Sequence, residues 1–167
     1  MVEQFTVAAE AVGATVKRFT GRDGAVASLR EIVGNRPAVA SAIPEHFQSL
    51  IDTVSLISLD QADRADIGIS AAQAAIAATG SLLLELGDPA GRSATALPPV
   101  HVVLLRASAI VPDMYALGDT LQHHLASPAP SYLSLITGPS RTADIERVLT
   151  IGVHGPKELH ILILEGE

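Results

Sequence analysis

The sequence predicts an α/β fold: a three-layer, Rossmann-like arrangement in which a mainly parallel sheet is covered on both faces. Segments whose apolar residues recur at helical spacing alternate with short strands along most of the chain. Two strands, residues 100–105 and 159–164, are almost continuously apolar, as in strands buried on both faces. With 167 residues, 48% of them hydrophobic and 17% charged, the chain can bury one core. We therefore expect a single domain over residues 1–167.

The first half of the chain predicts three helices, each followed by a strand. Apolar residues at positions 2, 5, 9 and 12 share one helical face, and later helices repeat that spacing. Caps and breakers mark the helix boundaries. The boundary residues are Gly13, Asp23, Gly34 and Pro44, and the strands are expected over residues 15–19, 37–40 and 53–57.

The second half continues the alternation. Ser70 and Gln73 have the spacing of a capping box, which predicts an Ala-rich helix over residues 71–78. Residues 87–99 collect Gly, Pro, Asp, Ser and Thr, which predicts a surface loop. The remaining expected elements are a helix that begins at Pro112 and Asp113 and strands over residues 81–86, 100–105, 132–136 and 159–164.

Composition excludes several classes of function. The chain has no cysteine, which rules out a disulfide framework, a cysteine nucleophile, a thiolate zinc site and a cysteine-bound iron–sulfur cluster. The net charge is −7 and the 11 Lys and Arg residues are scattered, which argues against nucleic acid and anionic membranes as partners. The N-terminus has no basic, apolar leader pattern, and the longest uncharged run, residues 67–84, is rich in Ala, Gly and Ser. We expect a cytoplasmic protein without a membrane span.

The first candidate site follows the expected strand over residues 132–136, which we interpret as buried. Ligands collect at the carboxyl ends of strands in open parallel sheets. Gly138 permits close backbone approach, and Ser140 and Thr142 supply hydroxyls on either side of Arg141. If a helix begins near Thr142, its N-terminus and Arg141 would hold a carboxylate or phosphate.

An ordinary helix start explains the same residues. Ser140 or Thr142 would then cap the helix, Asp144 would complement its dipole, and Arg141 would pair with an acid. Asp144 and Glu146 are two residues apart and would not face each other on a helix, so they do not predict an acid–base pair.

The second candidate is His154, which lies between glycines in residues 152–156. It would serve as a general base or a hydrogen-bond donor, or else belong to a simple turn. A serine hydrolase built from Ser140, His154 and Asp144 lacks the Gly-x-Ser-x-Gly elbow. His101 and His160 lie inside strand-like runs and are interpreted as hydrogen-bonded core or edge histidines. No metal-ligand spacing, Gly-x-Gly-x-x-Gly or Walker pattern is present.

Four segments in order resemble the LUD domain family, and most closely its lactate utilization protein C branch. They are residues 68–82, 97–101, 137–146 and 152–156. The resemblance implies a fold similar to that of the sugar-phosphate isomerases and CoA transferases. It also places Thr79 and Gly80 at the ligand pocket, where Ala78 stands in place of the acid that family members usually carry.

The functional implication of this resemblance is a non-redox accessory subunit in the oxidation of L-lactate to pyruvate. Iron–sulfur clusters are then expected only in partner subunits, and this chain needs no cofactor of its own. The alternative is a stand-alone binding domain or enzyme for a small phosphorylated or acyl-type anion, and a purely structural role is a third. The resemblance assigns no catalytic residue.

Overall fold

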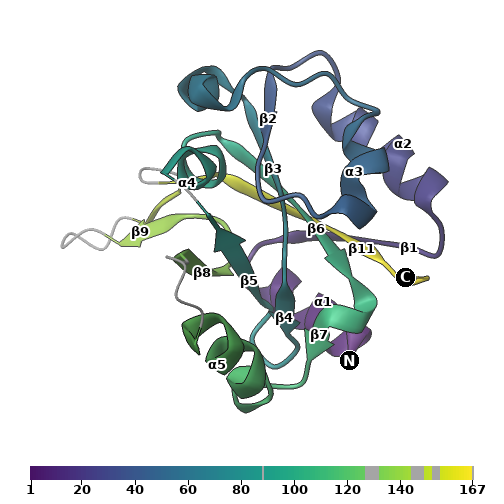
Figure 1. Ribbon diagram of the computed structural model, residues 1–167, viewed down its shortest axis with the longest axis vertical. Helices are drawn as coiled ribbons and strands as arrows, with labels where there is room; N and C mark the ends of the chain where they lie inside the picture. Colours follow the sequence, from purple (N-terminus) through teal and green to yellow (C-terminus); the bar gives the residue numbers. More distant parts are fainter. Residues whose placement is uncertain (88, 127–131, 144–148, 152–154, 167) are drawn as a thin grey trace.

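The central layer of the molecule is a five-stranded parallel sheet (Figure 1). The computed structural model describes residues 1–87, 89–126, 132–143, 149–151 and 155–166. The sheet order is β1-β11-β6-β3-β2, and its central strand β6 is buried along its first six residues. The strands are β1 (Thr15–Phe19), β2 (Ala38–Ala40), β3 (Ile67–Ala71), β6 (Val100–Arg106) and β11 (Glu158–Leu164). The prediction of a mainly parallel sheet is confirmed.

One face of this sheet is covered by α2 (Arg22–Val33) and α3 (Glu45–Ile51). Leu29 of α2 and Phe47 of α3 are buried against apolar side chains of β3 and β6. Asp23 lies within the first turn of α2 rather than at its N-cap, which is Gly21. The strand expected over residues 53–57 is wrong, since this segment has no ladder partner.

The opposite face is covered by α1 (Val2–Ala11) and a second, mixed sheet of order β7-β4-β5-β8. Its strands are β4 (Ala74–Ile76), β5 (Ser81–Leu86), β7 (Ile110–Val111) and β8 (Tyr132–Thr137). Leu82 and Leu84 of β5 pack with Val103 of β6, so the two sheets share a core. One covering layer is therefore a sheet and a helix rather than helices alone.

The helix predicted over residues 71–78 is wrong, because this segment belongs to β3 and β4. Ser70 does not cap a helix; it is fully buried in β3. Ala72, Ala75 and Ala77 lie in the core between the two sheets, where small side chains let the sheets approach each other. The high Ala content of this segment gives it high helix propensity, but tertiary packing overrides that preference and the segment forms strands.

The loop predicted over residues 87–99 contains a helix, α4 (Pro89–Ala96). Its small residues serve packing, since a Cβ added at Gly68 of β3 would lie 1.9 Å from the carbonyl oxygen of Ala94. The 3-10 helix η1 (Leu59–Arg64) packs beside α4, and Val39, Ala62 and Ala94 form a small cluster there. Gly68 therefore sets how closely α4 lies to the sheet.

The outer face of the second sheet is covered by η3 (Tyr115–Leu117) and α5 (Gly118–Ala126). The helix expected from Pro112 therefore begins later. Asp113 caps the η3 turn by accepting a 3.0 Å hydrogen bond from the Ala116 amide. The remaining elements are η2 (Ala107–Ala109) and the antiparallel pair of β9 (Arg141–Ala143) and β10 (Leu149–Ile151).

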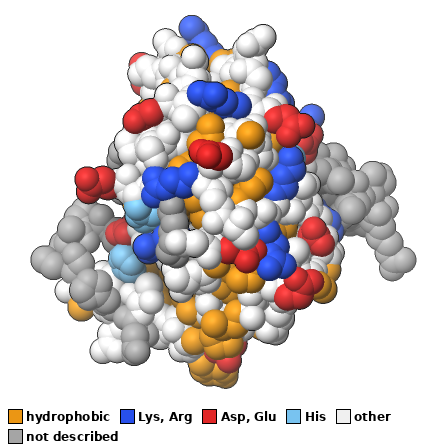
Figure 2. Space-filling model, turned by 90° about the vertical axis from the view of Figure 1, so that its right-hand side faces the viewer, with side chains coloured by type: hydrophobic (Ala, Val, Ile, Leu, Met, Phe, Trp, Pro, Cys, Tyr) orange, Lys and Arg blue, Asp and Glu red, His pale blue; other side chains and the backbone are white. Residues whose placement is uncertain are grey.

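The surface drawn in Figure 2 mixes basic and acidic side chains instead of forming a patch of one sign. Arg18 illustrates this pattern, because it forms 2.6 Å ion pairs with both Glu3 and Glu165. Within the part of the chain that the structure describes, no helix combines the length and apolar character needed to cross a bilayer. Because acidic and basic side chains are mixed on the surface drawn in Figure 2, that surface has no basic stripe that would bind a polyanion.

Candidate functional site

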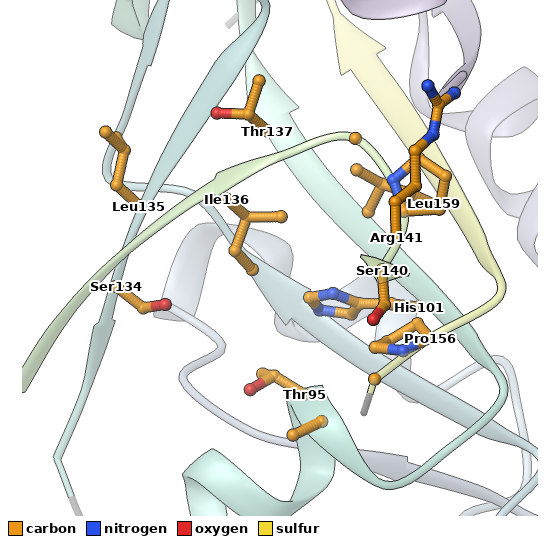
Figure 3. A pocket seen from close by; sticks show the side chains of 14 residues that line it. Thr95, His101, Ser134, Leu135, Ile136, Thr137, Ser140, Arg141, Pro156 and Leu159 are labelled. Atoms are coloured by element: carbon orange, nitrogen blue, oxygen red, sulfur yellow. The ribbon is translucent and has the colours of Figure 1, made fainter. Parts of the chain in front are cut away.

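A cavity of about 370 Å³ lies where the two sheets meet (Figure 3). This volume falls in the range of small-molecule sites. Its walls come from the end of α4, the start of β6 and β11, strand β8 and the segment after it. The lining residues include His101, Ser134, Ile136, Ser140, Pro156 and Leu159.

The cavity lies at the amino ends of β6 and β11, not at the carboxyl ends of the parallel strands. His101 is the second residue of β6 and Leu159 the second of β11. Strand β8 belongs to the second sheet, where it pairs antiparallel with β5. The interpretation of residues 132–136 as a buried strand is wrong, because Tyr132 and Leu135 are exposed. The carboxyl-end rule therefore does not locate this cavity.

Two glycine-containing segments of the sequence meet at the cavity. The Ser140 amide donates a 2.8 Å hydrogen bond to the carbonyl oxygen of Pro156. Gly155 approaches the Ser140 side chain so closely that an added Cβ would lie 3.0 Å from its Cβ. Gly138 has φ +70°, and its added Cβ would lie 2.5 Å from the Val12 carbonyl oxygen. The segment after β8 is thus fixed between residues 155–156 and the end of α1.

Arg141 lines the cavity, but its guanidinium is directed away from His101 and Pro156 (Figure 3). Its Nη2 donates a 2.8 Å hydrogen bond to the carbonyl oxygen of Val12, at the C-terminal end of α1. A cation at a helix C-terminus is favourable because it satisfies an unpaired carbonyl. This bond from Arg141 connects the cavity wall to the C-terminal end of α1.

The helix expected to begin near Thr142 is wrong, since Arg141 begins strand β9. Thr142 lies in β9, and its side chain is outside the described residues. Asp144, Glu146 and His154 also lie outside the described residues. Their assignment to the site stays a prediction.

Thr79 and Gly80 form the turn between β4 and β5, and neither lines the cavity. Thr79 is linked to the cavity by a chain of hydroxyl groups. Thr79 Oγ1 lies 2.7 Å from Ser81 Oγ, which lies 2.7 Å from Oγ1 of Thr137, a lining residue. Gly80 has φ +67° and touches the backbone of Ala9 in α1, so it packs that helix against the second sheet.

His101 is the principal lining residue that sequence reasoning did not assign to the site. Its imidazole is 1% exposed, and Nε2 lies 2.8 Å from Oγ of Ser70 on the neighbouring strand. Burial lowers the pKa of His101 to about 4, so the ring is neutral at physiological pH. The expectation of a hydrogen-bonded core histidine is confirmed, and the structure adds that this histidine borders the cavity.

Helix α4 and strand β8 both contribute lining residues to the cavity. The Arg92 guanidinium lies 4.7 Å from the ring centre of Tyr132, which links these elements. Among the described lining residues there is no carboxylate; the polar groups are hydroxyls, one imidazole and Arg141. No group of three or more His, Asp or Glu side chains suited to a metal ion occurs in the described ranges. The site is suited to hydrogen bonding of an oxygen-bearing ligand.

Residues 58–164 match the model of the LUD domain, and this stretch includes the described walls of the cavity. The chain belongs to the LUD domain family. The DUF162 family protein of Deinococcus radiodurans, known from a crystal structure, has the same fold, with a TM-score of 0.67. That comparison has 19% identity and covers 98% of this chain and 95% of the other.

Curated relatives of this LUD domain chain include lactate utilization protein C of Bacillus subtilis. It is 36% identical over 109 residues, which are 64% of this chain and 45% of that protein. The Escherichia coli protein YkgG is 36% identical over 111 residues, 65% of this chain and 48% of its own length. The match thus spans about half the length of these relatives.

Proposed function

We propose that this LUD domain chain is a non-redox accessory subunit in the oxidation of L-lactate to pyruvate in the cytoplasm. Similarity to proteins named lactate utilization protein C supports the process. The observation that carries a binding role is the cavity whose walls join Ser140 to Pro156 inside the family-matched stretch. The chain would bind a small anionic metabolite there.

Partner subunits would supply the redox chemistry. The chain has no cysteine with which to hold an iron–sulfur cluster in the usual way. Lactate oxidation removes two electrons, so the proposal assigns electron transfer to iron–sulfur or oxidoreductase subunits. This chain would present or sense the metabolite beside them.

Growth and co-purification test this function. Deleting the gene should abolish growth on L-lactate as sole carbon source, leave growth on glucose unchanged, and be rescued by a plasmid copy. A tagged chain purified from lactate-grown cells should bring down cysteine-rich subunits that contain iron. Normal growth of the deletion strain on lactate would refute the role, and failure of the plasmid copy to restore growth would trace the defect to a polar effect on neighbouring genes.

The size of the cavity favours a second candidate, a stand-alone binding domain or enzyme for an acyl-type anion. Lactate has six non-hydrogen atoms, whereas cavities of a few hundred Å³ hold larger ligands. This candidate predicts that an acyl carboxylate of four to eight carbons raises the melting temperature more than lactate does at equal concentration. Equal or smaller shifts across that series would eliminate it.

A further inference from the structure

We propose that the cavity recognises its ligand through the Nδ1–H group of a neutral His101. The ligand would be a small oxo- or hydroxy-monocarboxylate rather than a phosphate ester. This inference rests on the proposed function, because it uses the same cavity and names what binds there.

The first support is the placement of the imidazole. His101 is almost fully buried, and Nε2 is bonded to Ser70. Nδ1 has no hydrogen-bond partner among the described residues. The fully buried side-chain atoms without a partner in that part of the chain are Ser28 Oγ and His160 Nδ1, so Nδ1 of His101 is not completely closed off from solvent. Since His101 lines the cavity, its unpartnered nitrogen is reachable from that side. A buried polar atom without a partner is costly unless a ligand or water completes it.

The Ser70 contact fixes which nitrogen carries the proton. Ser70 is fully buried, and His101 Nε2 is the partner of its hydroxyl within the described part of the chain. If Nε2 donated, the hydroxyl proton of Ser70 would be left buried without an acceptor. If the hydroxyl donates to Nε2, that proton is satisfied and Nδ1 carries the ring hydrogen. The second arrangement leaves no buried hydroxyl proton unpaired and is therefore favoured.

The charge of the lining sets the ligand class. Arg141 is the cation among the described lining residues, and its Nη2 is bonded to Val12. A phosphate ester near neutral pH carries up to two charges, which buried sites compensate with forked Arg or Lys contacts. A monocarboxylate carries one charge and is satisfied by a few neutral donors. The wall of hydroxyls and imidazole therefore matches the smaller charge.

The remaining walls suit an oxygen-bearing ligand with a short apolar part. Ser140 and Ser134 line the cavity, and their hydroxyls have no hydrogen-bond partner within the residues described. Ser140 and His101 are both labelled in Figure 3 among the residues that line this cavity. Ile136 and Leu159 supply apolar surface on the same cavity. A carboxylate at His101 and Ser140, with a methyl or short alkyl group against Ile136, uses each of these groups.

Two isosteric variants of His101 separate the roles of the ring nitrogens. Asn places an amide nitrogen near the position of Nδ1, so it keeps a donor toward the cavity and loses the Ser70 contact. Gln places its amide near Nε2, so it keeps the Ser70 contact and loses the cavity donor. The control is His160→Gln, on the neighbouring strand, because His160 does not line the cavity.

Calorimetric titration of the purified chain with pyruvate, L-lactate, inorganic phosphate and glycerol 3-phosphate tests the proposal. Pyruvate or lactate should bind about tenfold or more tightly than either phosphate. His101→Gln should weaken that binding about tenfold, His101→Asn should bind more tightly than His101→Gln because it keeps a donor toward the cavity, and His160→Gln should stay within about threefold of the parent. Thermal unfolding of each variant establishes that it is folded.

Nitrogen-15 NMR of the imidazole gives an independent readout. The His101 ring should be protonated at Nδ1 in the free chain, and its Nδ1–H signal should shift when pyruvate is added. A ring protonated at Nε2, pyruvate binding unaffected by His101→Gln, tighter binding of glycerol 3-phosphate, or no binding of either monocarboxylate would each overturn the inference. If the His101 Nδ1–H signal shifts with pyruvate but the deletion strain grows normally on lactate, only the proposed function is refuted. If the deletion strain fails to grow on lactate but the signal does not shift, only this inference is refuted.

Discussion

The burial of His101 predicts a specific loss of stability in acid. Desolvation lowers the pKa of this imidazole from its ordinary 6.5 to about 4. Between these values the unfolded chain binds a proton that the folded chain does not, so the free energy of unfolding decreases as pH falls. The contribution is fully present above pH 6.5 and is lost progressively toward pH 4. At pH 4.5 the loss from this one group amounts to about 2–3 kcal/mol.

The variant His101→Gln isolates this contribution. Gln does not titrate, and its amide can keep a contact with Ser70, so the variant should fold while losing the acid-dependent term. Urea unfolding at pH 7.5 and pH 4.5 gives the change in stability for each protein. The parent should lose about 2–3 kcal/mol more than the variant over this interval. Subtracting the two removes the contributions of the acidic groups that both chains share.

A control excludes a general effect of losing any histidine. His160→Gln leaves His101 in place and should therefore keep the acid-dependent term of the parent. Parallel pH dependences of the parent and His101→Gln, within about 0.5 kcal/mol, would mean that His101 is protonated as easily in the folded chain as in the unfolded one. That result would refute the buried neutral imidazole on which the site depends.

Three further substitutions and one control, Gly118→Ala, test the packing around the cavity by urea unfolding. Gly68→Ala should destabilise the chain by more than about 3 kcal/mol or prevent folding, because the added Cβ would meet the Ala94 carbonyl. The control Gly118→Ala places its Cβ in open space and should change stability by less than about 1 kcal/mol. Gly138→Ala should cost about 2 kcal/mol or more, because φ is +70° and the Val12 carbonyl is close; a neutral result would contradict the described wall. Arg141→Met should cost less than about 1.5 kcal/mol and leave pyruvate affinity within about threefold, since its guanidinium bonds Val12; complete loss of binding would restore Arg141 as an anion clamp.

The central strands were predictable from the sequence because their nearly continuous apolar residues indicate burial on both faces. Residues 100–105 and 159–164 are apolar on both faces, and both became inner strands of the parallel sheet. The helix ends at Gly13 and Gly34 were also readable, since both glycines adopt positive φ after their helices. Local signals agreed with the tertiary structure at these positions.

Other elements could not be predicted because tertiary contacts decide them. Ala75 and its neighbours have helix propensity, but they fill the narrow space between two sheets, which no local pattern reveals. Residues 89–96 look like a loop by composition, yet they form α4, which lies against β3 because Gly68 leaves room for the Ala94 carbonyl. Strand β8 was correctly predicted as a strand but wrongly interpreted as buried, because it belongs to the second sheet and not to the central parallel one.

Three of the residues predicted to bind a ligand, Gly138, Ser140 and Arg141, line the cavity. The Ser140 amide donates to the Pro156 carbonyl oxygen, so the two segments are in contact, but that these residues bind a ligand stays a prediction. The role of Arg141 depends on where α1 ends in space, and no spacing along the chain predicts that. His101 did carry a signal: a histidine inside an almost continuously apolar strand needs a polar partner or a ligand. Here Ser70 satisfies one nitrogen and the cavity borders the ring.

A crystal structure of the chain grown with pyruvate tests the central claim most directly. We predict density for the ligand in the cavity between β6, β8 and residues 155–156, with a carboxylate or carbonyl oxygen about 3 Å from Nδ1 of His101. Pyruvate bound instead at the carboxyl ends of β1 and β11, with the His101 cavity filled only by water, would contradict the account.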